Sequence, residues 1–194
     1  MQQPYQFTFK PTILHKQQQL IIDSEFLLLN DLKIPKAEIA AIRYGVKGIK
    51  GYRFYIGRIY CIDIKTLNGK ILKLRLKSIY RVRKQLLYEK YAGIVNALFR
   101  TYFDDITRDY LTQHENKTQF SVLGIVITPE GVQFDKSTEI ISWFYLDIRT
   151  YWQYFTIFPV SNPANYKAFY YLQDWNAGVL LSVLRTISKE RKHL

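Results

Sequence analysis

Alternating apolar and polar positions predict that much of the chain forms short β-strands. The clearest case is residues 70–77, where leucines alternate with basic residues and would face a core. Asn68-Gly69, just before this segment, predicts a tight hairpin turn from a strand at residues 59–65. Shorter runs predict further strands at residues 7–9, 20–22, 26–29 and 34–44.

The spacing of apolar residues then changes to that of an α-helix. A helix is predicted from about residue 80 to at least residue 102, with an apolar stripe formed by Leu87, Tyr91, Ile94, Leu98 and Tyr102. It either ends at Asp104-Asp105, where a second helix would be capped, or continues to about Leu111. The polar residues 114–118 that follow are the predicted linker.

The second half of the chain repeats this order. Strands are predicted at residues 122–128, 132–134, 139–149, 151–158 and 166–172. Asp174 is the expected N-cap of a final helix that runs from Trp175 to about Lys189. The decad 92–101, Ala-Gly-Ile-Val-Asn-Ala-Leu-Phe-Arg-Thr, returns in similar form at 177–186. We therefore predict a duplicated unit, with one domain at 1–113 and a second at 119–194.

Corresponding segments occur in both halves. In the first half they are Leu20–Leu29, Ile34–Ile42, the Asn68-Gly69 hairpin and the helix; in the second they are Val126–Phe134, Ile140–Ile148, Tyr166–Leu172 and the helix. This order resembles a tandem of PH-like domains, nearest to the bacterial PH-like and GRAM-like branches. The resemblance implies an α+β, mainly antiparallel β fold with two repeats, each a bent sheet or partial barrel closed by a C-terminal helix.

Charge separates the two halves, although their predicted order of elements is the same. The net charge is +12, and residues 1–103 hold 19 Lys and Arg against 6 Asp and Glu, whereas residues 104–194 hold 9 against 10. Residues 45–58 contain four glycines and four cations and are predicted to form a long loop or an open hairpin. We expect one cationic, ligand-binding surface made by Lys47, Lys50, Arg53, Arg58, Lys73, Arg75 and Lys77. The alternative is a solvated charged surface with no ligand.

Aromatic residues make up 16% of the chain and are dense between residues 151 and 175. Strand alternation would turn about half of them into the core and half outward. Outward Tyr and Trp residues are typical of protein interfaces, so we predict an interface formed by Tyr151, Trp152, Tyr154 and Tyr170.

Few residues suggest catalysis. His15, His114 and His193 lie in polar or terminal segments and are expected to be exposed, and Cys61 is expected to be a buried apolar residue. Neither a metal-ligand spacing nor a phosphate-binding loop is present, so we expect no catalytic residues, metal or cofactor. With no secretory signal or membrane-spanning run, a soluble, cytoplasmic protein is expected. If its target is an anionic membrane, it would be a peripheral membrane protein.

These observations predict a non-enzymatic binding or adaptor protein. Its first repeat would engage an acidic protein or an anionic membrane surface through the cationic residues. One alternative is nucleic-acid binding, which basic charge with exposed aromatic residues also suits. The other is a structural subunit or inhibitor within a larger assembly, and the aromatic interface would also suit a homo-oligomer.

Overall fold

The computed structural model describes residues 3–12, 14–135 and 137–192. The chain divides into two compact units, Met1–Asp104 and Asp105–Leu194. The division falls nine residues before the end of the predicted first domain at residue 113. Both units consist mainly of antiparallel β-sheet with α-helix, so the chain is of the α+β class.

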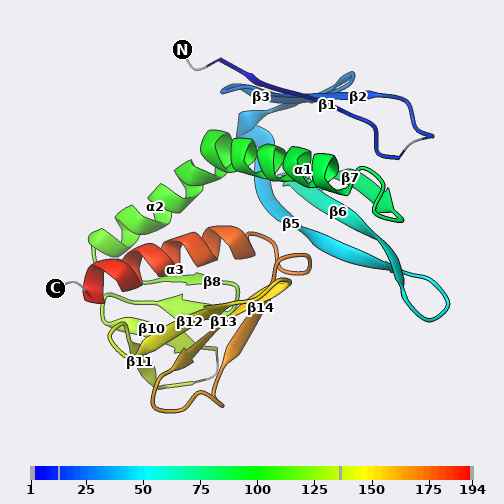
Figure 1. Cartoon of the computed structure of the whole chain (residues 1–194). Helices are drawn as coiled ribbons and strands as arrows, with labels where there is room; N and C mark the ends of the chain where they lie inside the picture. Colours follow the sequence, from blue (N-terminus) through cyan, green and yellow to red (C-terminus); the bar gives the residue numbers. More distant parts are fainter. Residues whose placement is uncertain (1–2, 13, 136, 193–194) are drawn as a thin grey trace. The chain divides into compact units, whose positions relative to one another are not determined.

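The first unit contains two antiparallel meanders followed by a helix (Figure 1). The first meander, in strand order β1-β2-β3-β4, consists of β1 (Tyr5–Phe9), β2 (Gln18–Ile22), β3 (Phe26–Leu29) and β4 (Leu32–Pro35). The short 3-10 helix η1 (Lys36–Glu38) leads to the second meander, which consists of β5 (Ile39–Lys50), β6 (Tyr55–Thr66) and β7 (Ile71–Ile79). Helix α1 (Lys84–Leu98) then packs against β1, β6 and β7. The predicted strands of this unit are confirmed except for the segment 34–44, which η1 divides between β4 and β5.

Residues 45–58 form a hairpin and not a long loop. β5 and β6 are both 12 residues long and pair from Ile39 opposite Thr66 to Lys50 opposite Tyr55. Gly57 permits β7 to pack closely against the other side of β6, because a Cβ added there would lie 2.3 Å from the Ser78 carbonyl oxygen. At least one of the glycines that suggested a loop, Gly57, therefore serves close strand packing.

The helix begins at Lys84, four residues later than expected. Residues 80–83 form a turn instead, and Tyr80, Arg81 and Arg83 have left-handed backbone with φ of 48°, 62° and 56°. The helical backbone then continues without a break from α1 through the π-helix η2 (Phe99–Phe103) and α2 (Asp104–Glu115). A helix end capped at Asp104-Asp105 was thus the wrong alternative.

The core of the first unit forms where α1 meets the sheets. Leu72, Leu74 and Leu76 are buried, as their alternation predicted, and so are Leu87, Ile94 and Leu98 on the helix. Gly93 fits beneath the ring of Phe7 on β1, where an added Cβ would lie 3.2 Å from the ring. The small residues of the repeated decad therefore let a strand approach the helix closely.

The second unit has the same order of elements after α2. The first meander, in order β11-β10-β9-β8, consists of β8 (Phe120–Val122), β9 (Ile125–Ile127), β10 (Gly131–Phe134) and β11 (Ile140–Ser142). The second consists of β12 (Leu146–Thr150), β13 (Tyr154–Pro159) and β14 (Lys167–Tyr170). Helix α3 (Ala177–Lys192) ends the unit, with Val179, Leu180, Val183, Leu184 and Ile187 buried as predicted.

Several boundaries in the second unit differ from the prediction. The segment 122–128 turns at Leu123-Gly124, where both residues have positive φ, and 139–149 is split by a turn at Trp143–Tyr145. Asp174 was predicted to cap the last helix, but its carboxylate accepts a hydrogen bond from the Tyr170 backbone N–H at 2.7 Å. It therefore closes the turn after β14, and the helix begins only at Ala177.

His114 is buried, which contradicts the expectation that it is exposed. It lies in the last turn of α2, is 6% exposed, and makes an edge-to-face contact with Trp143 at 5.6 Å between ring centroids. Burial lowers the pKa of His114, and the nearby positive charge of Arg191 lowers it further. His15 is exposed as expected, whereas His193 lies outside the described residues.

Candidate functional site

The register of β5, β6 and β7 gathers cations on one face of that sheet. Lys47 and Lys77 both pair with Ile59 in the ladder, and Arg75 pairs with Cys61 two residues further along β6. Residues opposite each other in a ladder point to the same face, which here is opposite to the buried leucines of β7. We call this the cationic sheet face, formed by Arg43, Lys47, Lys65, Lys73, Arg75 and Lys77. Lys47, Lys73 and Lys77 are exposed.

A carboxylate lies at the centre of this face. Asp63 is 3% exposed, with one oxygen, Oδ2, 3.0 Å from Arg43 Nε and the other, Oδ1, 2.6 Å from Arg75 Nη2. Arg75 also donates hydrogen bonds to the carbonyl oxygens of Leu74 and Ile62 at 2.8 and 3.2 Å. Asp63 therefore holds two arginines side by side on the sheet while neutralising one of their charges.

Cys61 lies beneath the same charged side chains. It is 2% exposed, as the sequence predicted, and burial raises the pKa of its thiol although the positive charges of Arg75 and Lys47 act in the opposite direction. The thiol is thus held neutral and packs as an apolar group.

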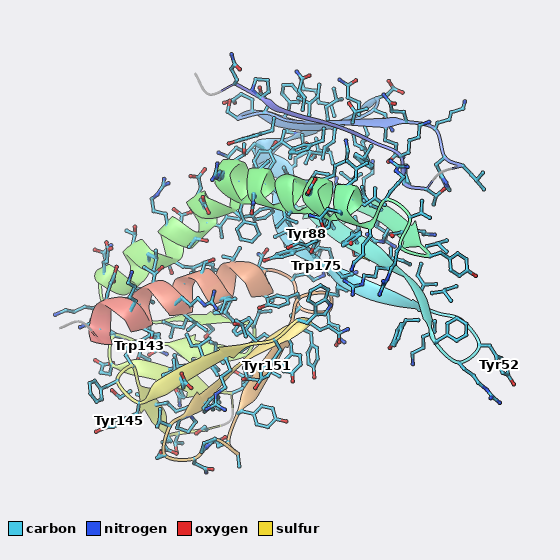
Figure 2. All side chains as sticks on the ribbon, viewed as in Figure 1. Tyr52, Tyr88, Trp143, Tyr145, Tyr151 and Trp175 are labelled. Carbon is cyan, nitrogen blue, oxygen red and sulfur yellow. The ribbon has the colours of Figure 1, made fainter. Side chains whose placement is uncertain are left out.

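Exposed aromatic rings alternate with cations at the end of the β5–β6 hairpin. We call residues 50–55 the hairpin tip; Gly51 N–H donates a hydrogen bond to the Phe54 carbonyl oxygen at 2.8 Å and closes it. Tyr52, Phe54 and Tyr55 are 93%, 67% and 68% exposed. Arg53 lies over the Tyr52 ring at 5.4 Å, and Lys50 over the Tyr55 ring at 5.6 Å. Figure 2 shows Tyr52 at the far end of the hairpin, pointing away from the rest of this unit.

Arg58 points to the other face of the hairpin. It pairs with Gly48 and Ser78 in the ladder, one residue out of step with Lys47 and Lys77. There it lines a groove of about 470 Å³, which we call the basic groove, lined by Phe54, Tyr55, Ile56, Gly57, Arg58, Ser78, Tyr80, Arg81 and Lys84.

The seven cations predicted to form one surface thus lie in three places. Lys47, Lys73, Arg75 and Lys77 share the cationic sheet face, Lys50 and Arg53 are at the hairpin tip, and Arg58 is in the basic groove. The prediction omitted Arg43 and Lys65, which the register adds to the sheet face. The sequence predicted that β6 pairs with β7 across the Asn68-Gly69 turn, but it did not predict the register of β5 against β6.

Three of the four predicted interface residues, Tyr151, Tyr154 and Tyr170, form a row on the three-stranded sheet of the second unit, and Trp152 lies in the turn between β12 and β13. The rings of Tyr151 and Tyr154 stack at 4.7 Å between centroids, and Tyr154 lies 5.2 Å from Tyr170 on the neighbouring strand. Tyr151, Trp152 and Tyr170 are exposed and Tyr154 is half-buried. Phe155 and Phe169 face the core as alternation predicted, but Phe158, on the same face of β13 as Tyr154, is buried as well, so the expected division is confirmed only in part. That these tyrosines bind a partner remains a prediction.

Comparison with protein-family models, curated proteins and solved structures returned no match for this chain. Within the described ranges, no helix is long and apolar enough to cross a bilayer. Across the same residues, no three His, Cys, Asp or Glu side chains are grouped so that they could hold a metal ion.

Proposed function

We propose that the chain is a binding protein of two PH-like domains whose first unit attaches to an anionic membrane surface. The PH-like part of the proposal is supported by the order of elements, because each unit has a four-stranded meander, a three-stranded meander and then a helix. Within each unit the two meanders are separate sheets, as in a bent or partly opened barrel.

The observation that carries the binding role is the composition of the cationic sheet face. Six cations and one carboxylate lie on three adjacent strands, and that carboxylate is buried between two of the cations. Neighbouring strands are about 4.8 Å apart and same-face residues about 6.7 Å apart along a strand, so the charges are concentrated. Such a surface attracts an anionic partner over roughly a Debye length, which is about 8 Å at physiological salt.

The hairpin tip favours a membrane over an acidic protein as that partner. Aromatic rings and basic side chains together are typical of segments that lie at the boundary between headgroups and acyl chains. Lys47 and Arg58 are each three residues behind the ends of the tip, or about 10 Å, and point to opposite faces of the hairpin. Because the headgroup layer is about 5–8 Å thick, a tip placed within it would leave both cations close to the charged surface.

Vesicle sedimentation tests the sheet face. A basic residue near an anionic membrane contributes about 1 kcal/mol, so Lys73→Gln with Lys77→Gln should weaken binding to vesicles containing phosphatidylglycerol about 30-fold at low salt. Lys33→Gln with Lys189→Gln removes the same charge from exposed positions on β4 and α3 and is the control, with little loss expected. Equal losses in the two variants would show that total charge, and not this face, determines binding.

A second pair of variants tests the hairpin tip. Phe54→Ser removes an exposed ring from the tip, and Phe144→Ser removes a ring of nearly equal exposure, 65% against 67%, from the second unit. Burying part of a Phe ring contributes roughly 1–2 kcal/mol, so Phe54→Ser should weaken vesicle binding about tenfold while Phe144→Ser leaves it unchanged. Failure of the wild-type protein to bind anionic vesicles, together with binding to polyglutamate or single-stranded DNA, would assign the face to an acidic protein or a nucleic acid instead.

A further inference from the structure

The basic groove is a separate cationic site with its own walls. It lies between the first residues of β6, the last residues of β7 and the start of α1, on the side of the hairpin opposite to the cationic sheet face. Arg58, Arg81 and Lys84 contribute three positive charges, and no carboxylate is among the described residues that line the groove. For Arg81 and Lys84, the described part of the chain shows no ion pair. Arg81 and Lys84 thus offer positive charges that a bound anion would balance.

A turn of unusual backbone geometry holds two of these cations in place. Tyr80 and Arg81 have left-handed φ values, which cost bulky residues about 1 kcal/mol or more each and persist only where the surroundings impose them. Here Tyr80 N–H donates a hydrogen bond to the Ile56 carbonyl oxygen at 2.8 Å, and the Ser78 hydroxyl donates to the Val82 carbonyl oxygen at 2.9 Å. These bonds attach the turn to β6 and β7 and keep Arg81 beside Arg58 and Lys84.

The chemistry of the lining suits a phosphate monoester. Such a group carries a charge of about −1.5 to −2 and three terminal oxygens, so it can be shared by several basic side chains. Guanidinium groups such as those of Arg58 and Arg81 bind it through paired hydrogen bonds, and a lysine adds a mobile charge. At about 470 Å³ the groove is larger than a phosphate group, and the side chains of Phe54, Tyr55 and Tyr80 on its walls offer apolar surface to the body that carries the phosphate.

We propose that the basic groove binds a phosphate monoester, carried by a lipid headgroup or by a soluble molecule. Binding of a lipid phosphate rests on the proposed membrane attachment. Phe54 and Tyr55 belong both to the groove and to the hairpin tip, so a tip placed in the headgroup layer would bring the groove to the lipid headgroups. Binding of a soluble phosphate does not depend on that attachment. In the lipid case, the sheet face supplies general attraction to negative charge and the groove selects the phosphate monoester.

Two lipids and one soluble compound distinguish these sources. Phosphatidic acid ends in a phosphate monoester, whereas phosphatidylglycerol carries only a phosphodiester, and vesicles of the two can be matched in surface charge. We expect wild-type protein to prefer phosphatidic acid about tenfold, as one additional charge-assisted hydrogen bond would give. Glycerol 3-phosphate, the soluble counterpart of that headgroup, should bind in calorimetry, whereas glycerol should not.

Matched variants separate the groove from the sheet face. Arg81→Gln with Lys84→Gln should abolish the preference for phosphatidic acid and the binding of glycerol 3-phosphate, while phosphatidylglycerol vesicles still bind. Lys73→Gln with Lys77→Gln should weaken binding to both vesicles and leave their ratio unchanged. A thermal melt of each variant verifies folding, and Lys84→Gln alone provides a milder change at an exposed position.

The outcomes separate this inference from the proposed function. Equal binding of the two charge-matched vesicles, together with no binding of glycerol 3-phosphate, would overturn the groove proposal and leave membrane attachment in place. Binding of glycerol 3-phosphate that requires Arg81 and Lys84, without any binding to anionic vesicles, would overturn membrane attachment and assign the groove to a soluble phosphate monoester.

Discussion

Replacing Asp63 should lower the stability of the folded protein and at the same time raise its affinity for anionic vesicles. The change Asp63→Asn keeps the size of the side chain but removes the negative charge between Arg43 and Arg75. Two arginines would then lie side by side on the sheet without a counter-charge. The folded state should become less stable, whereas the cationic sheet face should gain one net positive charge and bind anionic vesicles more tightly.

The expected sizes follow from burial. Breaking a fully buried ion pair costs about 3–5 kcal/mol, and an exposed one contributes less than about 1 kcal/mol. The Asp63 side chain is 4% exposed, but its partners are 25% and 29% exposed and can turn toward water. We therefore expect Asp63→Asn to lower the free energy of unfolding by about 2 kcal/mol. One added charge near an anionic membrane contributes about 1 kcal/mol, which is about a fivefold gain in affinity.

Urea unfolding and vesicle sedimentation at low salt measure the two effects on the same protein. Asp31→Asn, an equal change of charge at an exposed turn between β3 and β4, is the control and should alter stability by less than about 0.5 kcal/mol. If both variants are equally stable, the paired arginines do not depend on Asp63. If Asp63→Asn stays folded at the assay temperature and binds more weakly than wild type, the electrostatic account of the face is refuted.

Two further predictions concern buried polar groups. The Tyr102 hydroxyl donates to the carbonyl oxygens of Phe26 and Asp23 at 2.7 and 2.9 Å, so Tyr102→Phe should lower the free energy of unfolding by roughly 1–2 kcal/mol, with the exposed Tyr88→Phe as control. Burial lowers the pKa of His114, so below about pH 6.5 the unfolded chain binds a proton that the folded chain does not. The contribution of His114 to the free energy of unfolding should therefore be constant above pH 6.5, and the free energy of unfolding should fall as the pH drops below that value. His114→Gln should reduce that slope in urea titrations between pH 7 and 5, and an unchanged slope would show that another group causes it.

Alternation was a sufficient guide where one face of a strand is buried. The leucines of β7 and the cations between them could be assigned to opposite faces, since a side-chain period of two has only one arrangement that buries Leu72, Leu74 and Leu76. The start of the helix was harder to predict, because the residues before Lys84 have no special turn sequence. Their left-handed backbone is imposed by hydrogen bonds to β6 and β7, which are tertiary contacts.

Side-chain placement at the candidate site depended on the pairing of strands. Lys47 and Arg58 are both exposed cations of one hairpin, and nothing in their local sequence shows that they point to opposite faces. The register decides it, because Gly48 pairs with Arg58 and Lys47 with Ile59. His114 presented the same difficulty: its polar neighbours suggested a linker, but continuation of the helix to Glu115 buries its ring against Trp143.

The two units differ on the outer face of their three-stranded sheets. In the first unit the three-stranded meander presents cations around Asp63, and in the second the corresponding meander presents the adjacent rings of Tyr151, Tyr154 and Tyr170. The repeated decad does not account for this difference, because both copies lie in helical segments, residues 92–101 in α1 and η2 and residues 177–186 in α3. Both copies supply small and aliphatic residues where a helix meets a sheet, which is a requirement of packing. The outer face of each three-stranded sheet does not pack against the helix, so it can carry charged residues in one unit and aromatic rings in the other. We therefore expect the two units to bind different partners.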